Sequence, residues 1–361
     1  MLLSGPSFTH PSIPVAAHFL GSPSPASDPS SYLSALTALI ANYSLEVEYP
    51  LVDEPARRIG RRHGSARSAT AASKVRDRVP LVVNTQGWVK GLGADLLEKL
   101  KLESRPTHLF SFDGADEDRD GDEHEHEPAG CLRFRLEAAP ASPLDAKWSA
   151  ADLRTLSLVS YFHAILSPAS LSAALPSNTV ARTWDFSRPL VARAPLGVSW
   201  ADGETIASVH ILDSEVDYEQ VLHALNGSVV ALVRSATASD DLAPPTQAAP
   251  GFPYDAHAST PNPATSQCLG LALVRSIDPD SRTLHLLSPV PGQLLDAGPV
   301  SLVKGALELP VCLVLDFAAT DTDKEKGLCG VEWKDVPYFG GEGEGAGRRK
   351  VRRNLMRRGQ A

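Results

Sequence analysis

The chain has 361 residues, of which 43% are hydrophobic and 21% charged, and its net charge is −9. This balance is close to the globular average and excludes a wholly disordered chain, a coiled coil and a collagen-like chain. No apolar run approaches the roughly 20 residues that a membrane helix needs, so we expect no membrane partner. The four cysteines lie far apart and form no C-x-x-C pair, which argues against a cysteine zinc site or a disulfide framework and favours a reducing compartment.

The charge is strongly segregated along the chain. Residues 113–127 hold nine carboxylates and one arginine, whereas residues 348–358 hold seven basic side chains. The acidic run ends in the sequence DEHEHE (122–127), whose side chains suit divalent metals, but a self-solvating flexible run is the favoured interpretation. Residues 54–78 are basic, small and aperiodic, and together with 113–128 they are predicted to be disordered insertions.

The first half of the chain shows the pattern of an α/β protein. A helix is predicted to begin at Asp28 as N-cap with Pro29 in its first turn. Pro80–Val83 is predicted to be a buried strand and Val89–Leu102 a helix, which is the repeating unit of a parallel sheet. His108–Phe112 and Leu132–Leu136 are predicted to be the next strands.

A further helix is predicted to begin at Ser149, where Asp152 is placed to complete a capping box. After about Pro189 the pattern changes to short β-like runs with one helix at Asp217–Leu225. The predicted strands are Ala207–Leu212, Ser228–Val233, Cys268–Ile277, Thr283–Ser288 and Pro310–Phe317.

Several segments together resemble the eukaryotic polynucleotide 5'-hydroxyl kinases. The segment PLVVNTQGWVKGLGADLL at 80–97 is similar to the clasp of that family, and DLRTLSLVSYFHAIL at 152–166 is similar to its lid helix. GPSFTHPS at 5–12 and HFLGSPSPASDPSSYLSAL at 18–36 resemble two further family segments. The segments at 268–291 and 301–310 resemble the C-terminal domain of the nucleolar branch, which processes pre-rRNA.

The resemblance implies the fold class and the division into domains. We expect an α/β chain that forms the C-terminal part of a P-loop kinase-like parallel sheet domain, followed by a smaller, mostly-β domain. The boundaries predicted are 1–188 for the kinase part, 189–338 for the mostly-β domain with a loop at 239–267, and 339–361 for a basic tail.

The sequence departs from this family at the nucleotide site. Family members bind ATP through G-x-x-x-x-G-K-[ST], yet no glycine of this chain is followed by lysine. The family's acidic metal-site segment, D-x-D-x-G-Q, is also missing, and both would precede Gly5. ATP and Mg²⁺ are therefore cofactors that the resemblance implies, with no cofactor-binding or metal-binding residue assigned in this chain. We expect the chain alone to be inactive.

Candidate RNA-binding residues lie in the sequence Asn84–Trp88. A loop between a strand and a helix offers backbone N–H groups to phosphate, Gly87 offers backbone freedom, and Trp88 offers a flat face on which a base can stack. Spacing alone favours a packing role for Trp88 at a helix start. The resemblance reverses this preference and implies that Thr85 and Trp88 hold the 5' end of RNA, so Thr85, Gly87 and Trp88 are assigned to RNA binding.

Arg154 is the candidate catalytic residue. The resemblance implies that it acts from the lid helix on the transferred phosphoryl group, where a guanidinium stabilises negative charge. An ordinary exposed helix arginine is an equally weighted alternative. Val159 and Ser160 occupy the region where family members often carry a second lid arginine.

The resemblance thus implies an ATP-dependent kinase of RNA 5'-hydroxyl ends in pre-rRNA spacer processing, located in the nucleus and nucleolus. A ribonuclease that generates 5'-hydroxyl ends is the implied partner. The basic tail can bind RNA phosphates, act as a localisation signal or contact that partner. The alternative is a non-catalytic RNA-binding or scaffold protein of a pre-rRNA-processing complex.

Overall fold

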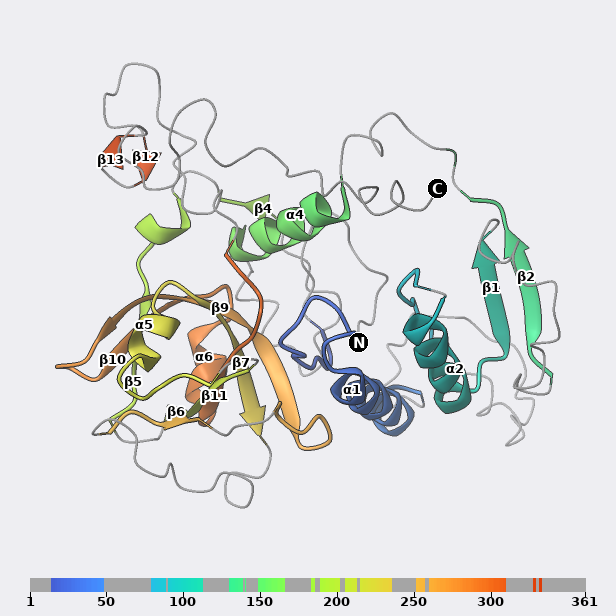
Figure 1. Cartoon of the computed structure of the whole chain (residues 1–361), viewed down its shortest axis with the longest axis horizontal. Helices are drawn as coiled ribbons and strands as arrows, with labels where there is room; N and C mark the ends of the chain where they lie inside the picture. The colour runs from blue at the N-terminus through green and yellow to red at the C-terminus, as the bar shows by residue number, and fades with distance from the viewer. Residues whose placement is uncertain are drawn as a thin grey trace, which may run out of the picture.

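The computed structural model describes residues 14–48, 79–112, 130–165, 183–235, 251–309 and 327–332, apart from gaps at 89, 139, 141–148, 186–188, 202–204, 213–214, 257–259 and 329–330. Figure 1 shows helices and a small sheet from the first half of the chain beside a larger sheet from the second half. The predicted insertions, the tail, the DEHEHE run and the strand Pro310–Phe317 lie outside the described residues. Within the described residues, no helix is long and apolar enough to cross a membrane.

Two helices form the centre of the first half. In α1 (Pro29–Asn42) the carboxylate of Asp28 accepts a hydrogen bond from the Ser31 backbone N–H at 3.0 Å, which confirms the predicted N-cap. A π-helical turn (Tyr43–Val47) follows. Helix α2 (Leu92–Ser104) packs against α1 and buries Leu96 and Leu100.

The predicted strand Pro80–Val83 is wrong. Residues 79–88 adopt no helix or strand, and Leu81, Val82 and Val83 are exposed. A strand requires a neighbouring backbone to bond its N–H and C=O groups, and the described chain places no strand beside this segment. A run of apolar residues is therefore not enough to predict a strand, because a strand also needs a neighbouring backbone to pair with.

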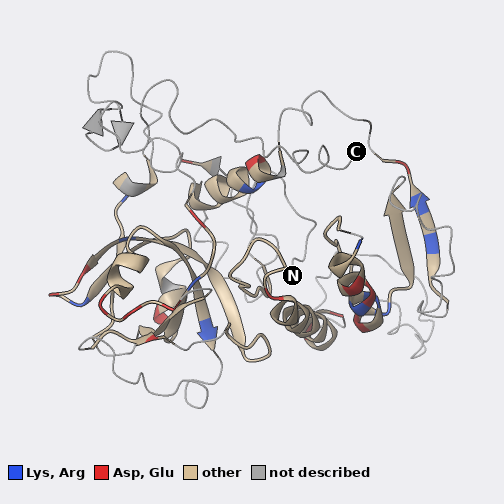
Figure 2. Ribbon diagram, viewed as in Figure 1, with Lys and Arg blue, Asp and Glu red and all other residues tan. Residues whose placement is uncertain are grey.

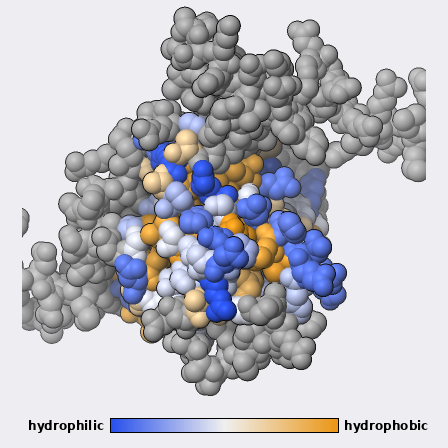
Figure 3. All heavy atoms as spheres, turned by 90° about the vertical axis from the view of Figure 1, so that its left-hand side faces the viewer, coloured by the Kyte–Doolittle hydropathy of each residue, from blue (hydrophilic) through white to orange (hydrophobic). Residues whose placement is uncertain are grey.

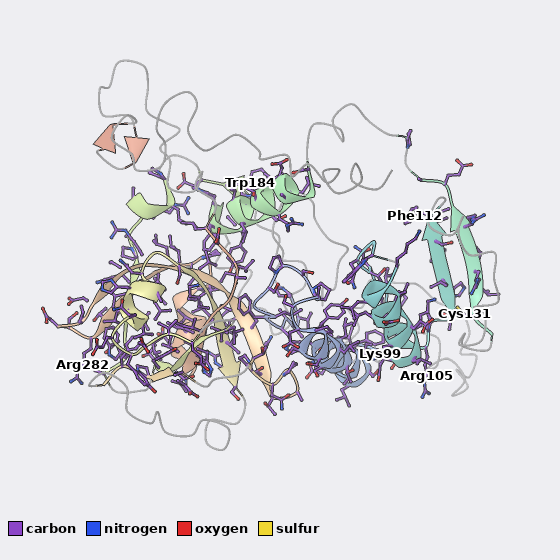
Figure 4. All side chains as sticks on the ribbon, viewed as in Figure 1. Lys99, Arg105, Phe112, Cys131, Trp184 and Arg282 are labelled. Carbon is purple, nitrogen blue, oxygen red and sulfur yellow. The ribbon has the colours of Figure 1, made fainter. Side chains whose placement is uncertain are left out.

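Strands β1 (His108–Phe112) and β2 (Leu132–Leu136) are confirmed and pair in parallel, with His108 opposite Leu132. One face of the pair is apolar and exposed: Phe110 is 56% exposed and Phe112 59%. Figure 4 shows Phe112 at the end of β1 and Cys131 at the start of β2. The same face carries a stack of rings, with the Phe110 and Phe134 centroids 5.2 Å apart. Parallel sheets are normally covered on both faces, but the described residues leave this face largely exposed.

The second half is built on a seven-stranded sheet with the order β5-β10-β9-β7-β11-β6-β8. Strand β6 is parallel to both of its neighbours, and every other pair is antiparallel. Its strands are β5 (Leu196–Ser199), β6 (Ile206–Ile211), β7 (Val229–Ser235), β8 (Tyr254–Asp255), β9 (Ser266–Asp278), β10 (Thr283–Leu287) and β11 (Val300–Lys304). The α/β class with a following mostly-β part is confirmed.

Some elements of this part differ from the prediction. The helix expected at Asp217–Leu225 is a single short turn, α5 (Val221–Leu225), and the loop expected at 239–267 contains β8. Strands β5 and β11 and the short helix α6 (Gly292–Asp296) were not predicted. Four further two-residue strands are present: β3 (Ala164–Ile165), β4 (Thr183–Trp184), β12 (Gly327–Leu328) and β13 (Val331–Glu332).

Apolar side chains are buried on both faces of the large sheet. On one face Val230 and Leu232 join Trp200, Phe252 and α5 in the main core. Figure 3 shows hydrophilic residues covering much of the outside of this part, with smaller apolar areas between them. On the other face Val229 and Ala231 belong to separate buried clusters.

Segments from the first half of the chain cover that second face. Helix α4 (Ala150–Phe162) contributes Phe162, and the segment before α1 contributes Phe19. Backbone bonds tie the latter segment to the sheet, because the Cys268 N–H donates to the Ala17 carbonyl at 2.8 Å and the Ala306 N–H to the Gly21 carbonyl at 2.6 Å. Contacts therefore cross the boundary predicted at residue 188.

A buried polar cluster lies on the second face. The Ser208 hydroxyl donates to the Ser301 hydroxyl at 2.8 Å and lies within hydrogen-bond distance, 2.5 Å, of His210 Nε2. Burial lowers the pKa of His210, and the attraction of Asp255 opposes this only partly. His210 is therefore held neutral in the folded state.

This predicts a loss of stability in mild acid. The unfolded chain binds a proton on His210 below about pH 6.5, while the folded chain resists it, so stability is present above that pH and is lost as the pH falls. The melting temperature should be lower at about pH 5.5 than at about pH 7.5. In the His210→Gln variant the difference should shrink, and an equal difference in both proteins would contradict this role for His210.

The exposed face of β1 and β2 predicts self-association of this chain when it is produced by itself. Exposed apolar surface beside unpaired strand edges favours aggregation. The double variant Phe110→Ser, Phe134→Ser should scatter less light than the parent at equal concentration. Leu45→Ser is the control, because Leu45 is 85% exposed but lies on the π-helical turn. A monodisperse parent would contradict the prediction.

Candidate functional site

The structure brings Thr85 and Trp88 together at one crevice between α1 and α2. The crevice is shallow and partly open to solvent, and it encloses no space large enough for a water molecule. It is lined by Tyr32, Thr85, Gln86, Trp88, Gly93, Leu96, Leu97 and Leu100. Its lining combines apolar side chains with a hydroxyl, a phenol and a carboxamide, so a ligand could meet it only along its outer surface.

The Trp88 indole packs directly on the backbone of Gly93, and we call this contact the seat of the indole. A Cβ at Gly93 would lie 2.5 Å from Trp88 Cγ and 2.7 Å from Cδ2, and it would also clash with the Trp88 carbonyl oxygen. The indole therefore rests directly on the backbone of the first turn of α2. Trp88 remains 38% exposed, so it is neither a core residue nor a free surface residue.

A hydrogen bond holds the loop to α1. The Tyr32 hydroxyl donates to Gln86 Oε1 at 2.7 Å across a separation of 54 residues. Burial raises the pKa of Tyr32, with the Gln86 bond opposing that shift, so the phenol stays protonated as a donor. Sequence reasoning assigned no role to Tyr32 or Gln86, because no local pattern links residues so far apart.

The prediction that Gly87 is needed for its backbone freedom is wrong. Its φ lies outside the left-handed region, and a Cβ there would meet nothing within 4 Å. The glycine that needs special backbone freedom is Gly91, the N-cap of α2, whose φ is 57°. Gly91–Gly93 was predicted to lie inside a helix; α2 begins at Leu92, so Gly93 lies in the helix as predicted and Gly91 is its N-cap.

Arg154 lies away from this crevice. It is exposed on α4, and Figure 1 shows α4 well separated from α1 and α2. The capping box that starts α4 is confirmed: the Ser149 hydroxyl accepts from the Asp152 N–H at 3.3 Å, and the Asp152 carboxylate accepts from the Ser149 N–H at 2.7 Å. Val159 packs on a buried cluster and Ser160 is itself buried, so neither position could present a second arginine to solvent.

The described residues do not fit ATP or a metal ion. Figure 2 shows mixed charge on α2 and basic side chains on β2. Among the residues that can be described, no group of three or more His, Cys, Asp or Glu side chains could hold a metal ion. The sequence also holds no Gly-Lys pair for a phosphate cradle.

Known proteins resemble this chain over the segments that form the crevice. The family model described as "mRNA cleavage and polyadenylation factor CLP1 P-loop" matches residues 61–164, which include the crevice loop, α2 and α4. A Cryptococcus neoformans protein named polynucleotide 5'-hydroxyl-kinase GRC3 is 33% identical over 98% of this chain and 48% of its own length. The resemblance to polynucleotide 5'-hydroxyl kinases is confirmed.

Two further matches show how much of each known protein this chain covers. The Schizosaccharomyces pombe polynucleotide 5'-hydroxyl-kinase grc3 is 27% identical over 99% of this chain and 47% of its own length. The chain therefore spans about half the length of the curated relatives it matches. A solved structure described as the extended interface between Pcf11p and Clp1p matches 59% of this chain and 42% of that one. The identity is 15% and the TM-score 0.31, values too low to support a conclusion about fold or function.

The seat of Trp88 can be tested with two glycine variants. Gly93→Ala should displace the indole and weaken binding of single-stranded RNA by ~1–3 kcal/mol, the value of one stacked base, although alanine favours the helix. Gly292→Ala is the control, because Gly292 lies in α6 outside the crevice lining and its Cβ would enter open space. Fluorescence anisotropy with labelled RNA measures both. Equal affinity of the two variants would contradict the seat.

Proposed function

We propose that this chain is part of an ATP-dependent polynucleotide 5'-hydroxyl kinase that phosphorylates the 5'-hydroxyl ends of RNA. The observation that carries the proposal is the half-exposed Trp88, seated on Gly93 and held beside Thr85 at the edge of a crevice. This arrangement lies in a chain that is 33% identical to a protein named as such a kinase.

In this proposal the crevice binds the RNA end. The exposed part of the Trp88 indole stacks on a base, and the Thr85 hydroxyl bonds a neighbouring polar group of the nucleotide. Fixing the RNA end in this way brings the 5'-hydroxyl into reach of the phosphoryl group and lowers the entropic part of the barrier. Arg154 lies away from the crevice, so in this proposal it supplies positive charge on the side of the transferred group that faces α4.

The sequence holds no Gly-Lys pair and the described residues hold no metal site, so in this proposal ATP and Mg²⁺ are bound by another segment of a longer protein. The relatives are about twice as long as the part matched, which leaves room for such a segment. The uncovered face of β1 and β2 is consistent with a sheet that continues into it.

We further propose a role in pre-rRNA spacer processing in the nucleolus, beside a ribonuclease that leaves 5'-hydroxyl ends. The support is the resemblance of 268–291 and 301–310 to the nucleolar branch and the seven basic residues in 348–358. Imaging of the tagged natural protein, with and without residues 348–358, tests the location.

A non-catalytic RNA-binding or scaffold protein is the second candidate, and the missing Gly-Lys pair favours it. Calorimetry with ATP on the natural full-length protein separates the two. Binding together with transfer of phosphate to a 5'-hydroxyl RNA supports the kinase, whereas RNA binding alone supports the scaffold.

The Trp88→Ala variant of the full-length protein should bind single-stranded RNA ~1–3 kcal/mol more weakly. Its melting temperature should change much less than that of Trp200→Ala, because Trp200 is 5% exposed in the main core and the loss of such a side chain costs ~3–5 kcal/mol. Melting and anisotropy are measured on both. A large loss of stability with unchanged affinity in Trp88→Ala would remove the RNA role.

A further inference from the structure

A side chain of α4 completes the hydrogen bonding of the large sheet where one strand ends. The ladder between β9 and β10 stops at the pair Leu273–Leu287. Beyond it, the Leu271 N–H donates to the Tyr161 hydroxyl at 2.7 Å, and that hydroxyl donates to the Leu271 carbonyl at 3.2 Å. The Ser288 hydroxyl also donates to this carbonyl, at 2.7 Å. The phenol therefore takes the place of a strand neighbour.

The sheet is shaped to accept this phenol. A Cβ at Gly270 would clash with the Tyr161 oxygen and would lie 2.5 Å from Val290 Cγ2. The pairing of β9 with β7 shifts register at this position, as at a β-bulge, which changes the direction of the strand locally. Burial raises the pKa of Tyr161, so its hydroxyl stays protonated at neutral pH.

Only the C-terminal half of α4 is attached to the sheet. Phe162 is buried against Leu273, and Leu158 and Val159 pack beside it. Residues 153–157 are all exposed, and Leu153 and Leu156 are 55% and 52% exposed. Arg154 is in this exposed half, seven residues and therefore roughly 10 Å along the helix axis from Tyr161.

We propose that Tyr161 is a positioning residue for Arg154. Its hydroxyl locks α4 onto β9, so the mostly-β part of the chain sets the direction in which the exposed half of the helix projects. Without this bond the apolar contacts of Phe162 still hold α4 to the sheet, but they are less directional than a hydrogen bond. The proposal rests on the proposed function in one respect, namely that Arg154 acts on the transferred phosphoryl group.

The lock is tested first without any activity measurement. Tyr161→Phe removes only the hydroxyl, and Tyr254→Phe is the matched control, because the buried Tyr254 phenol donates to the Val216 carbonyl at 3.1 Å in the same part of the chain but does not bond α4. Hydrogen exchange of the 150–162 peptide should accelerate about five-fold in Tyr161→Phe and remain at the parent rate in Tyr254→Phe. Equal exchange in both variants would overturn the lock.

Positioning is tested in the full-length protein by a double-mutant cycle. Tyr161→Phe should lower kcat about five- to ten-fold and leave KM for RNA within about two-fold, because Arg154 acts in the transition state. Arg154→Ala should lower kcat about a hundred-fold. In the Arg154→Ala background, Tyr161→Phe should have little further effect, because its influence passes through the missing guanidinium.

Two results would overturn the proposal in different ways. An equal loss of kcat from Tyr161→Phe in both backgrounds would show a merely structural role for the phenol, and the proposed function would be unaffected. An unchanged kcat in Arg154→Ala would remove Arg154 from the proposed function and the positioning role with it, whatever the exchange measurement shows.

Discussion

A sheet with apolar side chains on both faces has to be covered on both faces, and the arrangement of this chain depends on that requirement. In β7 the consecutive residues Val229–Val233 are all buried, which is the pattern of a strand between two covering layers. One layer comes from within the mostly-β part, through Trp200, Phe252 and α5. The other comes from α4 and from the segment before α1. The mostly-β part is thus completed by residues on the far side of the predicted boundary.

The same requirement is not met at β1 and β2. Their parallel pairing is the arrangement of a doubly covered layer, yet Phe110, Phe112 and Phe134 remain exposed on one face. Within the described residues the large sheet is covered on both faces, whereas one face of the small sheet stays largely exposed.

Local patterns predicted the start of each helix that has a side-chain cap. Asp28 with Pro29, and Ser149 with Asp152, act on backbone groups within three residues, so sequence alone contains the information. The strand Pro80–Val83 and the glycine at 87 were wrong because strand pairing and backbone angles depend on what surrounds a segment. Strand β8 was missed for the same reason, since Tyr254 is buried by its place beside β6 and has no strand pattern of its own.

The bonds that position the candidate residues could not have been predicted, because they join distant parts of the chain. Tyr32 bonds Gln86 over 54 residues, and Tyr161 bonds Leu271 over 110. In both cases a phenol on a helix bonds a segment from a distant part of the chain. The candidate residues Thr85, Trp88 and Arg154 were identified by resemblance, whereas the residues that orient them became visible only in the fold.

Packing and ligand binding are not alternative roles for Trp88. An indole that projects freely into solvent loses rotamer entropy when a base stacks on it, which weakens binding. An indole already pressed onto Gly93 has lost that freedom on folding, while its exposed part remains available. In the proposed function, this partial burial lets Trp88 offer its exposed part to a base at a low cost in rotamer entropy, because the indole is already packed on the start of α2.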